Sequence, residues 1–326
     1  MKRSSSGLHA LLAIDKPLGM TSHDVVGKLR RALHERRIGH AGTLDPEACG
    51  VLVVGIGQGT RLMGMLTAES KRYRARICFG TQTTTDDATG DIVATASIPQ
   101  QLFDKSFAQQ ALSSLVGEQE QVPPVYSAIS INGKRAYDLA RKGNTVELPP
   151  RHITIHEASL VSVSSTDPLI WDVDIHASKG TYIRSIARDL GLKLGTVAHI
   201  CGLCRTQSGS ISIDACTALE QIQALQDLPE EERKTVLQKS WIDPICALGH
   251  PVRELSDAEM EDVRCGRKLW LGSDLQQLLT ADHQRASLLY IGKLVGVWER
   301  IGKKLVCVAN FPDGIDGVRG SCNNIH

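Results

Sequence analysis

The sequence predicts a mixed α/β (α+β) protein with two folded parts. Strand-like stretches are interleaved with segments of helical periodicity along most of the chain. We expect strands near residues 11–14, 51–56, 70–77 and 151–176, and helices near 24–33, 100–116 and 217–239. The 326 residues suit two domains. From about residue 247, one helix followed by short strands predicts the smaller of the two.

The composition is that of a soluble globular protein, with 42% hydrophobic and 22% charged residues. No apolar run approaches the roughly 20 residues that a membrane-spanning helix needs. The basic start, residues 1–9, is expected to be disordered. The apolar stretch Leu8–Ile14 is too short for a signal peptide and lacks a small-residue cleavage site. These features predict a cytoplasmic protein with no membrane contact.

The nine cysteines form no regular framework, which suits a reducing compartment. Cys201 and Cys204 have the spacing of half a zinc site, with His199 just before them. A structural zinc site needs four ligands, usually from two such pairs, and the sequence has no second pair. We therefore expect no metal site and interpret the cysteines as small buried hydrophobic residues.

Positive charge is concentrated in the first quarter of the chain, although the net charge is only +1. Residues 1–80 hold 13 Lys and Arg against 6 Asp and Glu, whereas residues 81–246 hold 14 against 20. A local basic region is what phosphate contact requires, and it is also what an ordinary solvated surface can show.

A glycine-rich loop holds one carboxylate next to a buried strand. The segment 37–60 reads RIGHAGTLDPEACGVLVVGIGQGT, with Asp45 between Leu44 and Pro46. Pro46 fixes its own φ and disfavours helix at Asp45. A carboxylate in a rigid loop beside a core strand is placed like a catalytic group. Closing a turn is the alternative role, because Asp and Pro are common turn residues.

Two further segments combine basic and aromatic residues. In Ser70–Ile77 four cations surround Tyr73, an arrangement that suits phosphate contact beside a ring on which a base stacks. An ordinary half-buried strand tyrosine is the alternative. In 178–191 (SKGTYIRSIARDLG), Arg184 stands where a strand or turn becomes a helix. Taken alone, it is interpreted as a surface arginine at the start of a helix.

These segments resemble the tRNA pseudouridine synthase B family. The matching residues, in the family's order, are KPLGMTS (16–22), GHAGTLDP (39–46), KRY (71–73), TTTDDATGD (83–91), PPVYSA (123–128), KGTYIRSIARDLG (179–191) and LCRT (203–206). The chain departs from the family at Ser130, where a lysine is usual, and at Cys204, which replaces an arginine.

The resemblance implies the pseudouridine synthase fold, with a large mixed, mainly antiparallel sheet flanked by helices and loops. It implies a catalytic domain at 10–245, with an RNA-clamping insertion at about 122–150. The small β domain at 247–312 resembles the PUA RNA-binding module, a small β-barrel. A flexible tail is expected at 313–326.

The implied reaction detaches uracil from its ribose and rejoins it through C5, in uridine 55 of the tRNA T arm. Asp45 is then the nucleophile or base, Tyr73 stacks on the uracil, and Arg184 pairs with Asp45, keeping it ionised. The implied substrate-binding residues are His40, Lys16, Asp87, Tyr182, Leu203 and Arg205. No cofactor is expected because substrate and product are isomers. We expect a monomer that needs no protein partner.

Three other functions stay open at this point. A guide-RNA-dependent synthase would use partner proteins. A non-catalytic RNA-binding protein would rely on the C-terminal module. A carboxylate glycosidase would need a second acid, for which Asp87 is the nearest option.

Overall fold

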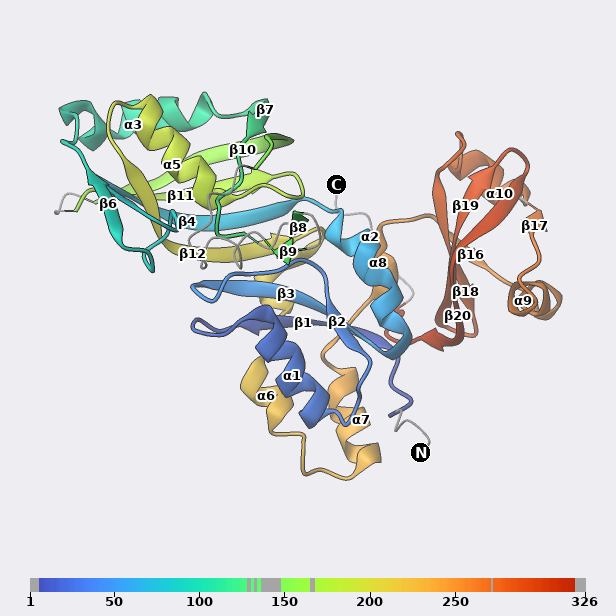
Figure 1. The fold of residues 1–326 in the computed structure, drawn as a ribbon. Helices are drawn as coiled ribbons and strands as arrows, with labels where there is room; N and C mark the ends of the chain where they lie inside the picture. The colour runs from blue at the N-terminus through green and yellow to red at the C-terminus, as the bar shows by residue number, and fades with distance from the viewer. Residues whose placement is uncertain are drawn as a thin grey trace. The chain divides into compact units, whose positions relative to one another are not determined.

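The computed structural model describes residues 6–127, 130–131, 134–135, 148–164, 168–270 and 272–319 (Figure 1). The chain divides into two compact units, which are described separately. The first contains Met1–Pro46, Gly50–Ala68 and Ser208–His326, and the second contains Glu47–Cys49 and Glu69–Gln207. Most of the expected RNA-clamping insertion, including the Ser130 side chain, lies outside the described residues.

The first unit is built around two long antiparallel strands, β1 (Ala10–Lys16) and β3 (Ala48–Ile56). Short strands extend this pair: β2 (Ile38–His40) on β3, and β14 (Thr217–Ala218) and β15 (Trp241–Ile242) on β1. The β1–β14 pair is parallel and the others are antiparallel, so the sheet is mixed. The expected strands at 11–14 and 51–56 are thus confirmed.

One face of these strands is covered by helices. Helix α1 (Ser22–Ala32) begins with a capping box at Thr21, and α6 (Leu219–Gln223) and α7 (Glu230–Gln238) lie later in the chain. Apolar side chains of all three pack with Leu12 of β1 and Val54 of β3. The helix expected at 217–239 is therefore two helices, because Pro229 starts a new one at its N-cap.

The C-terminal residues form a curled half-barrel sheet of five strands in the same unit. Its order is β16 (Val252–Glu254), β18 (Arg285–Tyr290), β19 (Lys293–Ile301), β20 (Lys304–Ile315) and β17 (Leu269–Trp270). Three further helices are α8 (Pro244–Leu248), α9 (Asp257–Arg264) and α10 (Ser273–Leu278). Trp298 is fully buried, and its indole N–H donates to Asn310 at 2.8 Å, so the small sheet has its own core.

Both expected flexible ends are packed where the structure describes them. Leu8 is 4% exposed, and Ser6 donates to Glu35 through its backbone and its hydroxyl. Ile315 is fully buried, and the Asp316 N–H donates to the His9 carbonyl at 2.8 Å. The expectation of disorder is therefore wrong for residues 6–9 and 313–319, since these two segments stabilise each other.

A second apolar cluster joins the N-terminal strands to the C-terminal sheet. Leu11 and Val53, on the face opposite the helices, belong to the same buried cluster as Phe311 and Val297. The segment that follows β3 in the chain is a 3-10 helix, η1 (Gly57–Leu62), and the helix α2 (Met63–Thr67) comes directly after it. The small C-terminal sheet is thus part of the first unit and shares one of its hydrophobic cores.

The second unit is a mainly antiparallel sheet with the order β12 (Ala198–Ser208), β4 (Lys71–Phe79), β11 (Ile170–Ala177), β10 (Arg151–Val163) and β7 (Gly117–Gln121). Helices α3 (Lys105–Ser113) and α5 (Ile183–Lys193) cover one face (Figure 1). Trp171 and Phe79 meet edge to face in the core, with ring centroids 4.7 Å apart. This unit confirms the strands expected at 70–77 and 151–176.

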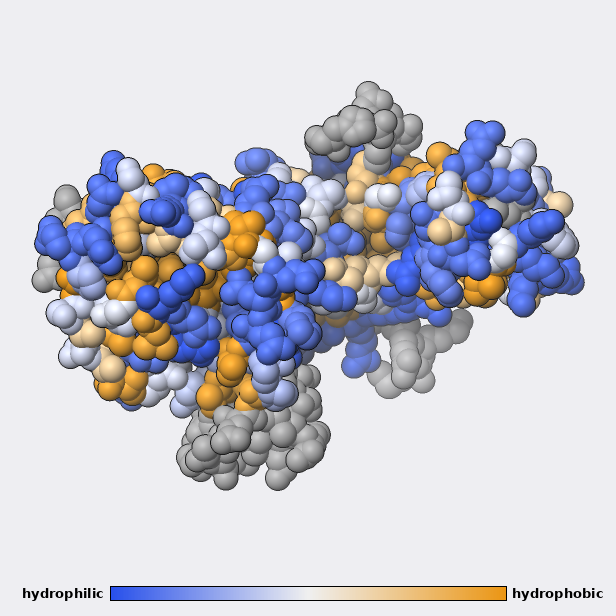
Figure 2. Space-filling model, turned by 90° about the horizontal axis from the view of Figure 1, so that it is seen from above, coloured by the Kyte–Doolittle hydropathy of each residue, from blue (hydrophilic) through white to orange (hydrophobic). Residues whose placement is uncertain are grey.

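The remaining elements are short. They are β5 (Thr81–Thr83), β6 (Ile92–Thr95), β8 (Ser130–Ile131), β9 (Lys134–Arg135), β13 (Ile211–Ser212) and the 3-10 helices η2 (Gln100–Phe103) and η3 (Ile213–Ala215). The helix expected at 100–116 is η2 followed by α3, because the Asp104 side chain caps α3. On the face drawn in Figure 2, hydrophilic and apolar residues are interspersed. Within the described part of the chain, no helix has the length and apolarity to cross a membrane.

Candidate active site

The loop that carries Asp45 is clamped on both sides of the carboxylate. The buried Ser22 hydroxyl, at the start of α1, accepts from the Leu44 N–H at 2.8 Å and donates to the Leu44 carbonyl at 3.1 Å. On the other side, the Gly19 N–H donates to the Pro46 carbonyl at 2.9 Å. Asp45 itself is half-buried. The loop is therefore held by its backbone neighbours, which fixes the direction of a partly exposed carboxylate.

Lys16 lies beneath the same loop. It is fully buried, and its Nζ donates to the carbonyls of Pro17 at 2.9 Å, Met20 at 2.6 Å and Pro46 at 3.4 Å. These bonds tie the end of β1 to the turn before α1 and to the Asp45 loop. The structure therefore gives Lys16 a role in shaping the loop. His40, the last residue of β2, is half-buried opposite Val54.

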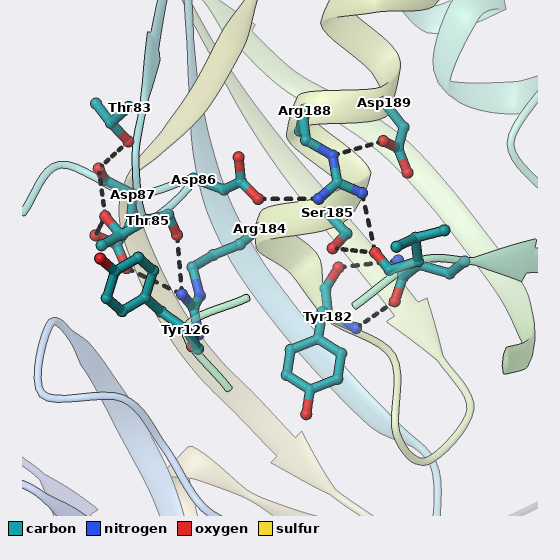
Figure 3. Close-up of polar contacts among 12 residues, drawn as sticks. Thr83, Thr85, Asp86, Asp87, Tyr126, Tyr182, Arg184, Ser185, Arg188 and Asp189 are labelled. Atoms are coloured by element: carbon teal, nitrogen blue, oxygen red, sulfur yellow. Dashed lines mark hydrogen bonds and ion pairs between the residues drawn. The ribbon is translucent and has the colours of Figure 1, made fainter. Parts of the chain in front are cut away.

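Arg184, the second residue of α5, sits in a cage of oxygen acceptors in the second unit (Figure 3). Its Nη1 donates to the Thr85 carbonyl at 2.9 Å and lies 3.5 Å from Asp87 Oδ2, while Nη2 donates to the Tyr126 carbonyl at 3.0 Å. The residue is 5% exposed. It is therefore not the surface arginine that was the alternative, because its guanidinium is oriented by several fixed acceptors.

Asp87 is held as firmly as the arginine it contacts. Its Oδ1 accepts from the Thr85 hydroxyl at 2.6 Å, the Thr89 hydroxyl at 2.6 Å and the Thr89 N–H at 3.0 Å. The carboxylate thus organises its own turn with one oxygen and pairs with Arg184 through the other.

One turn further along α5, Arg188 makes a parallel set of contacts that the sequence analysis missed. Arg188 Nη1 lies 3.0 Å from Asp86 Oδ2, its Nε lies 2.8 Å from Asp189, and its Nη2 donates to the Val122 carbonyl at 2.9 Å (Figure 3). Burial raises the pKa of Asp86 above its ordinary value, and the two nearby arginines oppose that rise. The sequence does contain a pattern that indicates these pairs: the aspartates 86 and 87 are adjacent, and Arg184 and Arg188 are spaced to lie one turn apart on a helix.

The remaining expected site residues lie on β4, β12 and the start of α5. Tyr73 and Leu203 are half-buried and pack on the core of the second unit, and Arg205 is 1% exposed. Tyr182 is the N-cap residue of α5, and its backbone exchanges two hydrogen bonds with the Gln121 amide, at 2.8 and 3.0 Å.

The cations around Tyr73 do not form the free phosphate-binding set that the sequence suggested. Arg72 pairs with Glu157 at 2.6 Å and Asp174 at 3.1 Å; Arg74 pairs with Asp174 at 3.3 Å. Arg76 pairs with Asp172 at 3.3 Å. Lys71 is 6% exposed, and its pKa is lowered to about 8, mainly by burial and then by Arg205. The expectation failed because the carboxylates on β10 and β11 are far away in the sequence.

In the part of the chain that the structure describes, no group of three or more His, Cys, Asp or Glu side chains is arranged to bind a metal ion. The cysteines differ from the uniform buried set we expected. Cys78 is buried, Cys265 and Cys307 are exposed, and Cys246 is disulfide-bonded.

The expected site residues are therefore divided between the two units. Asp45, His40 and Lys16 belong to the first unit, and the other six expected residues belong to the second: Tyr73, Asp87, Tyr182, Arg184, Leu203 and Arg205. The pairing of Asp45 with Arg184 stays a prediction.

Comparison with known proteins decides the family. The N-terminal domain of TruB family pseudouridylate synthases matches residues 30–183, and the C-terminal domain of tRNA pseudouridylate synthase B matches residues 184–246. The chain belongs to the TruB family. A relative from Mycobacterium sp. (strain KMS) is 44% identical over 79% of this chain and 84% of its own length. One from Corynebacterium efficiens is 41% identical over 91% and 94%. Both are named tRNA pseudouridine synthase B.

TruB membership makes the chain a pseudouridine synthase, an isomerase, as the sequence motifs predicted. Solved structures agree on the fold. An H/ACA ribonucleoprotein bound to a substrate RNA containing 2′-deoxyuridine gives a TM-score of 0.65 at 20% identity, covering 95% of this chain and 88% of that one. A Cbf5–Nop10–Gar1 complex gives 0.65 at 21% identity, covering 94% and 85%. The expected pseudouridine synthase fold is confirmed.

Proposed function

We propose that this TruB-family chain converts uridine 55 in the T arm of tRNA to pseudouridine, with Asp45 as the catalytic nucleophile or base. The observation that carries the proposal is the double clamp on the Asp45 loop, by Ser22 at Leu44 and by Gly19 at Pro46. An enzyme that must present one carboxylate to an extruded base benefits from such a preorganised group. The relatives named tRNA pseudouridine synthase B support tRNA as the substrate.

The reaction breaks the bond between uracil N1 and ribose C1′ and forms a bond between C5 and C1′; C5 loses its proton to solvent and N1 gains one, so the product is an isomer of the substrate. Asp45 either attacks C1′, adds to uracil C6 or removes the C2′ proton. Tyr73 stacks on the uracil and returns about 1–3 kcal/mol of the cost of unstacking it from the RNA. The positively charged guanidinium of Arg184 lies beside the Asp45 carboxylate and orients it. His40 occupies the space that the extruded base leaves in the RNA, and Leu203 forms one wall of the uracil pocket. Lys16, Asp87, Tyr182 and Arg205 complete the proposed binding site.

The structure weakens the glycosidase alternative. Asp87 was the nearest candidate for a second acid, but one of its oxygens accepts three hydrogen bonds and the other pairs with Arg184. Both carboxylate oxygens of Asp87 therefore already have partners within the protein, which leaves neither oriented toward a leaving group.

Release of tritium from tRNA labelled with 5-³H-uridine tests the proposal, using the purified chain alone. We expect release from a wild-type transcript and none from a transcript with cytidine at position 55. Asp45→Asn should abolish release while tRNA binding persists. Glu47→Gln, which neutralises an exposed carboxylate two residues away, should retain it.

No release by the chain alone, together with release on adding a guide RNA and partner proteins, would support the guide-dependent alternative. Binding without release under either condition would support a non-catalytic RNA-binding protein. Free uracil in place of pseudouridine would support a glycosidase. Full turnover by Asp45→Asn would remove Asp45 from the mechanism.

A further inference from the structure

Arg151, the first residue of β10, differs from five other described arginines of the second unit. Its guanidinium carbon lies 5.9 Å from the centroid of the Tyr182 ring, a cation–π contact. Its Nε is inaccessible to solvent and has no hydrogen-bond partner. In the described part of the unit, by contrast, the arginines 72, 74, 76, 184 and 188 each pair with at least one carboxylate.

A guanidinium without a carboxylate needs an explanation, because a buried unsatisfied donor costs stability. Gln121, the residue directly opposite Arg151 on β7, does not satisfy it, since that amide is committed to the Tyr182 backbone. The side chain of Arg151 thus places a positive charge and its Nη donors here although its Nε forms no hydrogen bond with the described residues. Residues that break a local rule in this way are expected at binding sites.

A glycine turn lies close to the Arg151 guanidinium. Gly180 has a φ of +78°, and a Cβ at that position would lie 3.6 Å from Arg151 Nη1. The turn containing Gly180 is fixed to β10 by paired bonds between Ser178 and Thr154, both 2.8 Å. The guanidinium therefore lies between the Tyr182 ring and a turn whose backbone is fixed to β10.

Charged side chains of both signs lie near the Gly180 turn, because Lys179 and Glu118 line the same hollow. Lys179, next to Gly180, is exposed, and it and Arg205 both act to lower the pKa of Lys71. Glu118 and Glu120 of β7 are the closest acidic residues by register, opposite Thr154 and His152. Because side chains alternate along a strand, these carboxylates project from the other face of the sheet from Arg151. On the face that Arg151 shares with Gln121, the strand register therefore places no carboxylate of β7.

We propose that Arg151, stacked on Tyr182, binds a backbone phosphate of the substrate RNA. The proposal rests on the proposed function, because it assumes an RNA substrate at this site. A planar guanidinium oriented by an aromatic ring presents its N–H groups in a fork that matches phosphate oxygens. A phosphate, unlike a base, also satisfies the unneutralised charge.

The test is the salt dependence of tRNA binding by the full-length chain, measured by fluorescence anisotropy over a potassium chloride series. One lost phosphate contact should make the slope of log K against log salt shallower by about 0.7–0.9. For Arg151→Met we expect that change and about tenfold weaker binding at low salt. Arg74→Met is the matched control, because Arg74 is already paired with Asp174; it should leave the slope unchanged. Arg151→Lys keeps the charge and should keep the slope.

An unchanged slope in Arg151→Met would overturn the proposal, as would an equal change in Arg74→Met. A weaker affinity with an unchanged slope would indicate base stacking or a purely structural role and would equally refute it. If the methionine variant fails to fold, Arg151→Gln provides the same measurement. The slope is read from binding alone, so it does not depend on turnover. Absence of tritium release by the wild-type chain would refute the proposed function and leave the phosphate measurement intact.

Discussion

Lys71 offers the sharpest link between burial and a measurable free energy. It is 6% exposed, and its pKa is lowered from 10.5 to about 8, first by burial and then by the like charge of Arg205. The unfolded chain therefore binds more protons than the folded chain between about pH 8 and pH 10.5. Stability from this group is reduced below pH 8 and is regained as the pH rises through that interval. With these two pKa values, linkage gives a gain of about 2–3 kcal/mol between pH 7 and pH 10.

The perturbation is Lys71→Met, which keeps the length and apolar stem of the side chain and removes the charge. Other groups titrate over the same interval, so the quantity to compare is the difference between wild type and variant. Urea denaturation at pH 7, 8, 9 and 10 gives the free energy of unfolding of each. The lost bond from Nζ to the Glu69 carbonyl, 2.6 Å in the wild type, adds an offset that does not change with pH below about 8.

Between pH 7 and pH 10, we expect the free energy of unfolding of the wild type to rise by about 2–3 kcal/mol relative to that of the variant. A difference that stays constant within about 0.5 kcal/mol would show that Lys71 titrates near its ordinary value. The reasoning from burial would then be refuted, because water or a carboxylate would have to compensate the charge. A difference that changes in the opposite direction would mean that the folded state raises the pKa of Lys71.

Two other predictions concern the structure around Arg184. Asp87→Asn should lower turnover in the tritium assay by about 10- to 100-fold, because Arg184 loses the carboxylate that it contacts. Thr89→Val removes one hydrogen bond to Asp87 and should lower turnover far less. Equal losses of turnover in the two variants would contradict the ion-pair role. Gly191→Ala should destabilise the protein by about 1–3 kcal/mol in urea, because its Cβ would lie 2.6 Å from the Ala198 nitrogen. Gly64→Ala in α2, with nothing within 4 Å of the added Cβ, should be neutral or stabilising. Equal effects of the two glycine substitutions would refute the steric argument.

The sequence predicted the elements of the fold where the local pattern was strong. The apolar run before Gly57 became β3, and the alternating residues of 70–77 became β4. The sequence pattern did not predict which residues far apart in the chain form hydrogen bonds or ion pairs with each other. The Ser22 clamp on Leu44 joins residues 22 positions apart, and the acids that neutralise Arg72 and Arg74 come from β10 and β11.

The ends of the chain show the same limit. Residues 6–9 and 313–319 have the composition of flexible termini, yet each supplies backbone or side-chain partners to the other. The Asp316 N–H bonds to His9, and the Asp313 carboxylate lies 3.4 Å from the His9 ring. A composition rule treats each terminus alone, whereas their stability comes from contact across the full length of the chain.

The Asp86–Asp87 pair shows why adjacent residues of one type need not be redundant. Asp86 has a φ of +58°, a left-handed conformation that aspartate tolerates better than most residues. Neighbouring side chains in an extended strand point to opposite faces, so two consecutive carboxylates would not reach one helix. The left-handed turn at Asp86 lets one carboxylate meet Arg188 and the next meet Arg184, one helical turn apart. The Arg188 pair fixes the loop to α5, and this leaves the position of Arg184 determined by Asp87 and two carbonyls. A loop built this way holds the Arg184 guanidinium in one orientation through contacts within its own unit, before any RNA binds.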